Sequence, residues 1–257
     1  GTGKTAAFAL PTLQLLAPMA TTSASPARHP VRVLVLAPTR ELAIQVEQSF
    51  RAYAKHLPIR TTCVYGGVDM NAQIAELKRG VEVLVATPGR LLDHVQNKTV
   101  NFSQVSVLIL DEADRMMDMG FMPDIRRIIA LLPGQRQNLL FSATFPDEIR
   151  KLAATILHDP AEIQIASRNT VAERITHIVH PVGRERKRDL LCHLIRTRQL
   201  RQVLVFSGTR MGATRLAHHL RLEHIEADAI HGDKSQAERL VALDAFKSGK
   251  TAVLVAT

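Results

Sequence analysis

The chain has 257 residues, of which 46% are hydrophobic, and its mean hydropathy is close to zero. These values describe a soluble globular protein, and at about 150 residues per domain the length suggests two domains, each with its own core. Lysine and arginine number 33 against 24 aspartates and glutamates, and most of the excess follows residue 166. A basic second half fits a polyanion such as nucleic acid, but a solvated surface explains the charge equally well.

An apolar stretch near the start of the chain, Ala6–Ala20, is followed by a Ser- and Ala-rich segment, Thr21–Ala27. This order superficially resembles a secretory signal peptide. Pro11 and Gln14 interrupt the apolar run, no initiator methionine is present, and the run is too short to span a bilayer. We therefore expect a buried helix followed by a surface loop, and no membrane insertion.

Short, largely apolar runs, often rich in β-branched residues, recur along the first two-thirds of the chain. They lie at Val31–Leu36, Cys63–Tyr65, Val81–Val85, Val105–Leu110 and Asn138–Phe141. Helical patterns lie among them, at Arg40–Ala54, Asp124–Leu132 and Asp147–Leu157. Continuous apolar strands that alternate with helices predict an α/β domain, in which helices cover both faces of a mostly parallel sheet. Such a domain binds its ligands beyond the carboxyl ends of its strands.

The pattern breaks after a strand-like segment, Glu162–Ile165, at polar residues without periodicity, 167–174, which we interpret as a linker. It restarts with predicted strands at Thr176–Val182, Val203–Phe206, Ala227–Ile230 and Ala252–Val255, and helices at Arg186–Arg196, Met211–Leu222 and Gln236–Phe246. A faint repeat links the two halves, since a strand runs into Thr-Arg in both Val33–Arg40 and Val203–Arg210. We predict two similar domains, 1–166 and 175–257, and expect both to be truncated because the sequence starts and stops abruptly.

The two cysteines, Cys63 and Cys192, are far apart and flanked by apolar residues. No CxxC pair or histidine cluster accompanies them, which argues against a disulfide or a cysteine-bound metal. We expect thiols that pack in the core, as in the reducing cytoplasm.

The first residues match the end of a phosphate-binding loop, GxxxxGK[ST]: Gly1, Thr2, Gly3, Lys4 and Thr5. In such a loop small residues let backbone N–H groups close around phosphate oxygens at the start of a helix. Lys4 would reach the β- and γ-phosphates of a nucleotide, and the Thr5 hydroxyl would hold Mg²⁺. A lone Gly-Lys-Thr is weak evidence, because it also occurs by chance.

Two carboxylates, Asp111 and Glu112, stand where the apolar run Val107–Leu110 leaves the predicted sheet. Asp111 is placed to bind Mg²⁺ through water, and Glu112 to polarise a water molecule that attacks the γ-phosphate. The alternative is an acidic turn that caps a helix. The presence of Lys4 favours the catalytic interpretation, with Lys4, Asp111 and Glu112 acting on ATP.

Several short motifs, which follow one another in the family's order, make the sequence similar to the DEAD-box family of ATP-dependent RNA helicases. The most specific are Asp111-Glu-Ala-Asp114 and Ser142-Ala-Thr144, preceded by Pro38–Leu42, Gly66-Gly67 and Thr87–Arg90. The resemblance covers the whole chain, and residues 111–143 look most like the bacterial RhlE branch. It implies two tandem RecA-like domains, ATP and Mg²⁺ as ligands, and RNA-stimulated ATP hydrolysis that separates short RNA duplexes through domain closure.

The resemblance also implies roles for individual residues. Asp114, Ser142 and Thr144 would couple the nucleotide state to domain closure. The RNA backbone would be bound by Pro38, Thr39, Arg40, Gly66, Gly67, Thr87, Pro88, Gly89, Arg90, Phe206, Thr209, Gly232, Gln236, Arg239 and Thr257. With eight Phe, two Tyr and no Trp, we expect backbone contacts with little sequence specificity rather than stacking of bases on aromatic rings.

One motif departs from the family pattern, because Ser207-Gly208 stands where many relatives carry Thr-Arg after Phe206; Arg210 is a candidate substitute. Two other functions stay open, a DNA translocase and a non-catalytic RNA clamp or scaffold. The missing adenine-reading segment and arginine finger predict that this chain alone hydrolyses ATP poorly, because loss of such a finger costs about 10³- to 10⁵-fold in rate. We expect a cytoplasmic monomer whose partners are RNA and proteins of ribosome assembly or RNA decay.

Overall fold

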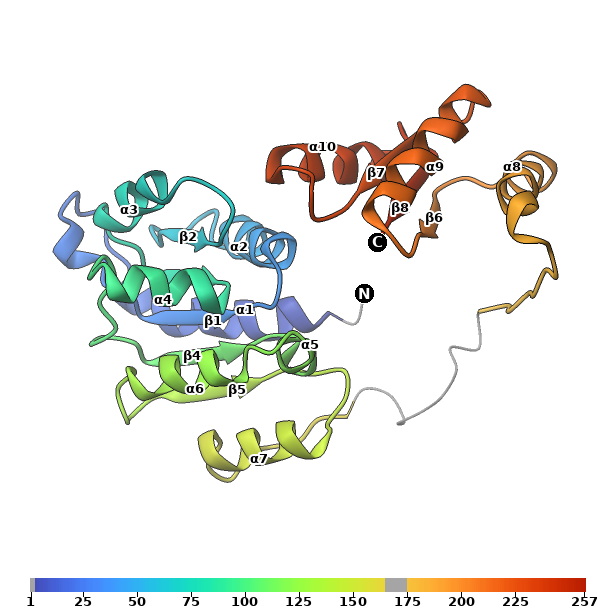
Figure 1. Cartoon of the computed structure of the whole chain (residues 1–257). Coiled ribbons are helices and arrows are strands. Elements are labelled where there is room, and N and C mark those ends of the chain that lie inside the picture. Colours follow the sequence, from blue (N-terminus) through green and yellow to red (C-terminus); the bar gives the residue numbers. More distant parts are fainter. Residues whose placement is uncertain (1–2, 165–174) are drawn as a thin grey trace. The chain divides into compact units, whose positions relative to one another are not determined.

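The computed structural model describes residues 3–164 and 175–257 (Figure 1). The chain divides into two compact units, Gly1–Thr170 and Val171–Thr257. Of the predicted features, the linker at 167–174 and the loop residues Gly1 and Thr2 lie outside the described residues. The predicted domain boundaries therefore stay predictions, and each unit is described by itself.

The first unit is built on a five-stranded parallel sheet with the strand order β2-β3-β1-β4-β5. The strands are β1 (Val33–Leu36), β2 (Thr61–Val64), β3 (Val83–Ala86), β4 (Val107–Leu110) and β5 (Gln137–Leu140). Val33 in the central strand pairs with Val83 on one side and with Val107 on the other. Because every pairing is parallel, the carboxyl ends of all five strands lie at one edge of the sheet.

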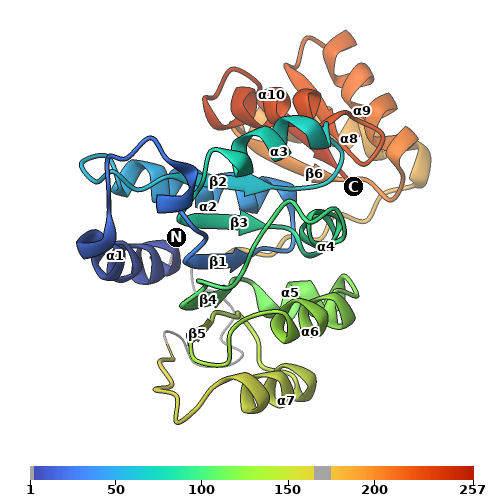
Figure 2. The ribbon, with the colours of Figure 1, turned by 90° about the vertical axis from the view of Figure 1, so that its left-hand side faces the viewer.

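Helices cover both faces of this sheet. They are α1 (Lys4–Leu16), α2 (Arg40–Tyr53), α3 (Met70–Lys78), α4 (Pro88–Gln96), α5 (Ala113–Asp118), α6 (Met122–Ala130) and α7 (Asp147–Ile156). Figure 2 shows α1 on one side of the sheet and α4, α5 and α6 on the other. Val33 and Val35 pack in the core with α1 and α2, whereas Leu34 and Leu36 pack in the core with the helices of the opposite face. All four side chains are fully buried, which explains why the strand sequence is apolar throughout.

The apolar stretch at the start of the chain forms α1, with Pro11 inside the helix, and a 3₁₀ turn, Ala17–Met19. The ring of Phe8 is completely buried and lies 6.0 Å from that of Phe50 and 5.1 Å from that of Phe141, measured between centroids. The predicted buried helix is therefore present, anchored by aromatic contacts to α2 and to the end of β5. Among the helices of residues 3–164 and 175–257, none is both long enough and apolar enough to cross a lipid bilayer.

The second unit contains a smaller parallel sheet with the order β6-β8-β7. Its elements are α8 (Lys187–Thr197), β6 (Val203–Phe206), α9 (Arg210–Leu222), β7 (Ala227–Ile230), α10 (Gln236–Lys247) and β8 (Val253–Ala256). Residues of α8 and α9 form one core with Val203, Val205, Val253 and Val255, and α10 packs on β7 and β8. The predicted fold class, parallel sheets flanked by helices in two units, is confirmed.

Two predicted strands are wrong. Residues 162–164 and 176–182 have no regular structure, and Ile163 and Val179 are 84% and 89% exposed. A strand needs a neighbour to accept and donate its backbone hydrogen bonds, and in the described part of the chain these segments pair with none. Three helices were not predicted, α3, α4 and α5, which are short, at six to nine residues.

Candidate nucleotide and RNA site

The predicted site residues of the first unit gather at the carboxyl edge of its sheet, and strand order separates them into two groups. The segments after β2, β3 and β1 carry the residues expected to bind RNA. The segments after β4 and β5 carry the residues expected to act on ATP. Because β2, β3 and β1 are consecutive in the sheet, each group occupies a continuous part of the edge.

The first helix begins in a geometry that suits an anion. Gly3, the residue before α1, has φ +74°, in the left-handed region that favours glycine. No side chain caps the helix, and its first turn carries no acidic residue. The N–H groups of that turn are therefore available for phosphate oxygens. Lys4 Nζ donates to the backbone oxygen of Ser142, after β5, over 3.4 Å.

Asp111 follows β4 and is 6% exposed. Its Oδ1 accepts a hydrogen bond from Glu112 N at 3.1 Å. Burial, reinforced by the charge of Glu112, raises the pKa of Asp111 to about 6, whereas that hydrogen bond and the charge of Lys4 lower it. Lys4 is thus close enough to stabilise the Asp111 carboxylate, and the two lie on the same side of the sheet.

Glu112 has an unusual backbone. Its φ of 50° and ψ of 54° place it in the left-handed region, which costs a residue with a side chain on the order of 1–3 kcal/mol and is typical of functional sites. The side chain is 41% exposed, and its Oε2 accepts a hydrogen bond from Arg115 Nη1 at 3.2 Å. The tight turn between β4 and α5 therefore presents the carboxylate to solvent, where it can meet a water molecule.

Hydrogen bonds join the turns after β4 and β5. Thr144 donates to Asp114 Oδ2 from its backbone N at 2.9 Å and from Oγ1 at 2.7 Å. Asp114 N donates to Ser142 Oγ at 3.2 Å. Burial raises the pKa of Asp114, but the hydrogen bonds from Thr144 and Ser142 outweigh it and hold the pKa below its usual range. The contacts expected among these three residues are present.

The donor atoms at this edge fit Mg²⁺ in a nucleotide complex. Asp111 is 6% exposed as a residue, and no described residue donates a hydrogen bond to its Oδ2. A carboxylate oxygen and the Thr5 hydroxyl are hard ligands of the kind that Mg²⁺ prefers, usually one or two per site, with phosphate oxygens and water completing the shell. No group of three or more His, Cys, Asp or Glu residues suited to a metal occurs in residues 3–164 and 175–257.

The residues expected to bind RNA surround the side chain of Arg40. Gly67 has φ +77°, and a Cβ added there would lie 2.0 Å from Arg40 Nη1, so the guanidinium rests directly on the Gly67 backbone. The hydroxyl of Thr39 accepts a hydrogen bond from Leu42 N at 3.3 Å and caps α2. Glycine is required here both for the backbone conformation and for the close approach of Arg40.

Arg90 approaches the same turn from the next strand. Its two Nη atoms both donate to the backbone oxygen of Val68 at 3.2 Å, and Nε lies 3.4 Å from Asp93 Oδ2. Thr87, the residue before α4, is buried and makes no capping hydrogen bond with its side chain. The structure thus brings together the predicted residues after β1, β2 and β3, although several of their donors are occupied by protein atoms.

In the second unit the predicted residues also follow strand ends. Phe206 ends β6 and is 74% exposed, and Thr257 follows the neighbouring strand β8. Thr209 accepts a hydrogen bond from Gly212 N at 3.0 Å and caps α9. The remaining predicted residues, Gly232, Gln236 and Arg239, lie before and within α10.

Arg210, the candidate substitute for the family's arginine, forms an ion pair with Asp233, 2.6 Å between Nη1 and Oδ1. Its guanidinium lies beside Gly232, where an added Cβ would be 3.5 Å away. Nothing in the sequence pattern singles out Asp233, because it lies in the turn before α10 and its partner lies 23 residues away at the start of α9. Arg115, which binds Glu112, was also missed, although its spacing of three residues is typical of helical ion pairs.

Comparison with known proteins agrees with this geometry. A family model described as DEAD/DEAH box helicase matches residues 1–152, and one described as helicase conserved C-terminal domain matches residues 186–257. The ATP-dependent RNA helicase dbp2 of Neurospora crassa is 45% identical over 263 residues, covering 100% of this chain and 46% of the relative. DBP2 of Chaetomium thermophilum is also 45% identical, with 47% of its length covered. The chain spans about half the length of these curated relatives.

Solved structures give the same result. Dbp5 of S. cerevisiae, bound to RNA and ADP BeF3, superposes with a TM-score of 0.79 at 28% identity, over 100% of this chain and 63% of that one. A DEAD box protein from Methanococcus jannaschii gives a TM-score of 0.57 at 35% identity, over 99% and 66%. The expected bacterial RhlE branch finds no support, since the relatives that we compared are fungal Dbp2 proteins.

Proposed function

Because the chain belongs to the DEAD/DEAH box helicase family, we propose that its protein is an ATP-dependent RNA helicase. RNA-stimulated ATP hydrolysis would drive the local separation of short RNA duplexes. The observation that carries this proposal is the convergence of Lys4 and Asp111 at one sheet edge, with Lys4 also bound to the Ser142 backbone. The names of the Dbp2 relatives and the RNA-bound Dbp5 structure support RNA as the nucleic acid.

Different residues at the carboxyl edge would bind the phosphates and activate the attacking water. The first-turn N–H groups of α1 and Lys4 would hold the phosphates, and Glu112 would orient a water molecule for attack on the γ-phosphate. When bound, Mg²⁺ would neutralise charge on the phosphate oxygens; Thr5 would hold it directly and Asp111 through water. Asp111 must be ionised for this role, so nucleotide binding should weaken as the pH falls below about 6.

Binding of the RNA backbone would involve the residues around Arg40 and Arg90. Guanidinium groups and backbone N–H groups beside glycines suit phosphate oxygens and do not read bases. The hydrogen bonds from Thr144 to Asp114 connect the turn that holds Glu112 to the turn after β5. A change at the γ-phosphate could therefore reach that turn and favour closure of the two units, as the coupling role of these residues requires.

The test is Glu112→Gln in the protein that carries this chain. ATP-dependent RNA binding should persist, because the amide keeps the shape of the side chain. Turnover should fall by about 10²- to 10⁴-fold, because the water loses its base. Glu148→Gln, an exposed carboxylate at the start of α7, is the matched control and should hydrolyse ATP normally. Wild-type turnover in Glu112→Gln would remove Glu112 from the proposed role.

Two further measurements separate the alternatives. Matched RNA and DNA oligonucleotides should differ in their stimulation of ATP hydrolysis, since only RNA offers the 2′-hydroxyl. Equal stimulation by DNA would favour a translocase that acts on DNA. A single turnover per protein molecule, rather than many, would favour a clamp that does not cycle. The cytoplasmic location, the monomeric state and the protein partners stay predictions.

A further inference from the structure

A second basic feature lies at the opposite edge of the first sheet, where β2 and β3 begin. A cavity of about 610 Å³ opens there between the ends of α2 and α3 and the loop that precedes β1. Four of its lining side chains are cationic and one is acidic: Arg51, Arg60, Lys78, Arg79 and Glu76. The candidate ATP and RNA residues follow the carboxyl ends of the strands, so this cavity is separate from them.

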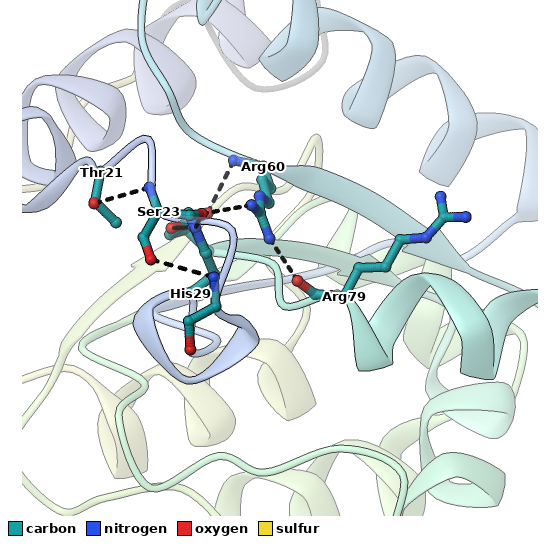
Figure 3. A network of polar contacts seen from close by, with 7 residues as sticks. Thr21, Ser23, His29, Arg60 and Arg79 are labelled. Carbon is teal, nitrogen blue, oxygen red and sulfur yellow. Dashed lines mark hydrogen bonds and ion pairs between the residues drawn. The ribbon is translucent and has the colours of Figure 1, made fainter.

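Arg60 is the fixed centre of this cavity. Its Nη1 donates to the backbone oxygen of Arg79 at 2.5 Å and its Nη2 to that of Ser23 at 2.8 Å. Figure 3 shows the guanidinium between the loop that carries Ser23 and the end of α3. A guanidinium has five N–H donors, and these two contacts leave three of them for a ligand. The carbonyl contacts hold the group in place without neutralising its charge.

A buried pair behind Arg60 supports it. His29 and Glu82 are 1% and 2% exposed. His29 Nδ1 lies 2.5 Å from Glu82 Oε1, its Nε2 lies 2.7 Å from the Ser23 oxygen, and Glu82 Oε2 accepts Arg60 N at 2.9 Å. The two Glu82 oxygens thus contact the His29 ring and the Arg60 backbone, and neither pairs with the Arg60 guanidinium.

Two of the other cations are already paired. Arg51 Nη2 lies 2.7 Å from Glu47 Oε1, and Arg79 Nη1 lies 2.8 Å from Glu76 Oε1. The side chains of Arg79 and Glu76 are 72% and 51% exposed, so their pair contributes little to stability and can rearrange around a ligand. The side chain of Glu47 is only 6% exposed and holds Arg51 through two hydrogen bonds, so Arg51 stays paired with it.

Lys78 differs from these two arginines. Neither Lys78 nor the Arg60 guanidinium forms an ion pair with a carboxylate in residues 3–164 and 175–257. Arg51 and Lys78 lie in the last turns of their helices, where a cation stabilises the helix dipole without any ligand. That explanation does not extend to Arg60, which lies outside any helix.

We propose that this cavity binds phosphates of an RNA segment that extends beyond the RNA-binding residues around Arg40 and Arg90 at the carboxyl edge. The inference rests on the proposed function, because it takes RNA as the ligand. Arginine and lysine around an open cavity provide charge-assisted hydrogen bonds to phosphodiester oxygens. They read no base, so the contact is independent of sequence and sensitive to salt. Long RNA therefore binds this protein more tightly than short RNA.

The test compares two double variants with equal changes in charge. Lys78→Glu with Arg79→Glu alters the cavity, and Arg126→Glu with Lys151→Glu alters exposed cations of α6 and α7. Binding of a short and a long fluorescent oligouridine is measured across a range of salt concentrations. The cavity variant should bind the long RNA about tenfold more weakly than wild type at low salt, and its log–log salt slope should fall by about 0.7 per lost phosphate contact. The affinity for the short RNA, and the rate of the ATP hydrolysis that this RNA stimulates, should be the same as in the wild type.

Several results would overturn the proposal. One is a control variant that loses as much RNA affinity as the cavity variant. Another is a cavity variant that loses affinity equally for short and long RNA, or loses none for long RNA. Calorimetry with inorganic pyrophosphate and with polyglutamate covers other ligands: if the cavity variant loses either one but keeps long RNA, the ligand is a free phosphate compound or an acidic peptide. If the wild type binds neither oligouridine, the proposed function fails instead, which is a different outcome. Circular dichroism of both variants checks that they fold.

Discussion

The cost of burying Asp111 can be measured through the variant Asp111→Asn. Burial and the neighbouring Glu112 charge raise the pKa of Asp111 from 3.8 to about 6. A shift of about 2 units corresponds to about 3 kcal/mol at 1.36 kcal/mol per unit. Asparagine has no charge to desolvate and keeps an oxygen that can accept the hydrogen bond from Glu112 N. We therefore expect Asp111→Asn to raise the free energy of unfolding of the first unit by about 1–3 kcal/mol at pH 7.

The sign of the pH dependence follows from the raised pKa. Below pH 3.8 the carboxyl is protonated in both the folded and the unfolded state, so the variant and the wild type should have similar free energies of unfolding. Above about pH 6 it is ionised in both states, and the folded wild type carries the full penalty. The advantage of Asp111→Asn should therefore grow as the pH rises from about 4 to about 7. At the same time the variant should lose Mg²⁺-dependent nucleotide binding, because a neutral amide attracts the cation and its bound water much less than a carboxylate does.

Tyrosine fluorescence during urea denaturation is the appropriate assay. The chain has no tryptophan, and its two tyrosines, Tyr53 and Tyr65, both lie in the first unit, so the signal reports on that unit alone. Asp118→Asn removes an exposed carboxylate of the same helix region and should change stability by less than about 0.5 kcal/mol. A gain that is the same at pH 4 and pH 7, or a loss of stability in Asp111→Asn, would refute the reasoning.

Two other substitutions test the remaining contacts at this edge. Gly67→Ala places a Cβ on the Arg40 guanidinium in a left-handed conformation, so we expect a loss of about 1–3 kcal/mol in urea denaturation and weaker RNA binding. Gly120→Ala has the same backbone strain with nothing within 4 Å and should leave RNA binding intact. Thr144→Val removes the hydroxyl that donates to Asp114 and should cost about 1 kcal/mol at neutral pH. That cost should shrink as the pH falls through the lowered pKa of Asp114, and Thr144→Ser should restore stability; a cost independent of pH would contradict the role of the hydrogen bond.

The class of fold and the identity of the chemical groups could be predicted because both depend on local sequence. Apolar runs of three to six residues and helical periodicity are properties of each segment, and they predicted the eight strands found in residues 3–164 and 175–257. The two predicted strands that the structure does not contain, in 162–164 and 176–182, show the limit of that approach. Whether an apolar segment becomes a strand depends on a hydrogen-bonding neighbour, and a segment cannot reveal whether it has one.

The sequence by itself predicted which residues would carry phosphate, metal and proton chemistry, because Lys4, Asp111 and Glu112 belong to motifs that span only a few positions. Only the tertiary structure decided which of them meet. Strand order placed β4 and β5 beside each other, and that pairing brings the ends of both strands together near Lys4. The same packing set Arg40 on Gly67 and enclosed Arg60 against Ser23 at the far edge of the sheet. Such contacts join residues that are distant along the chain, and they exist only once the whole sheet has assembled.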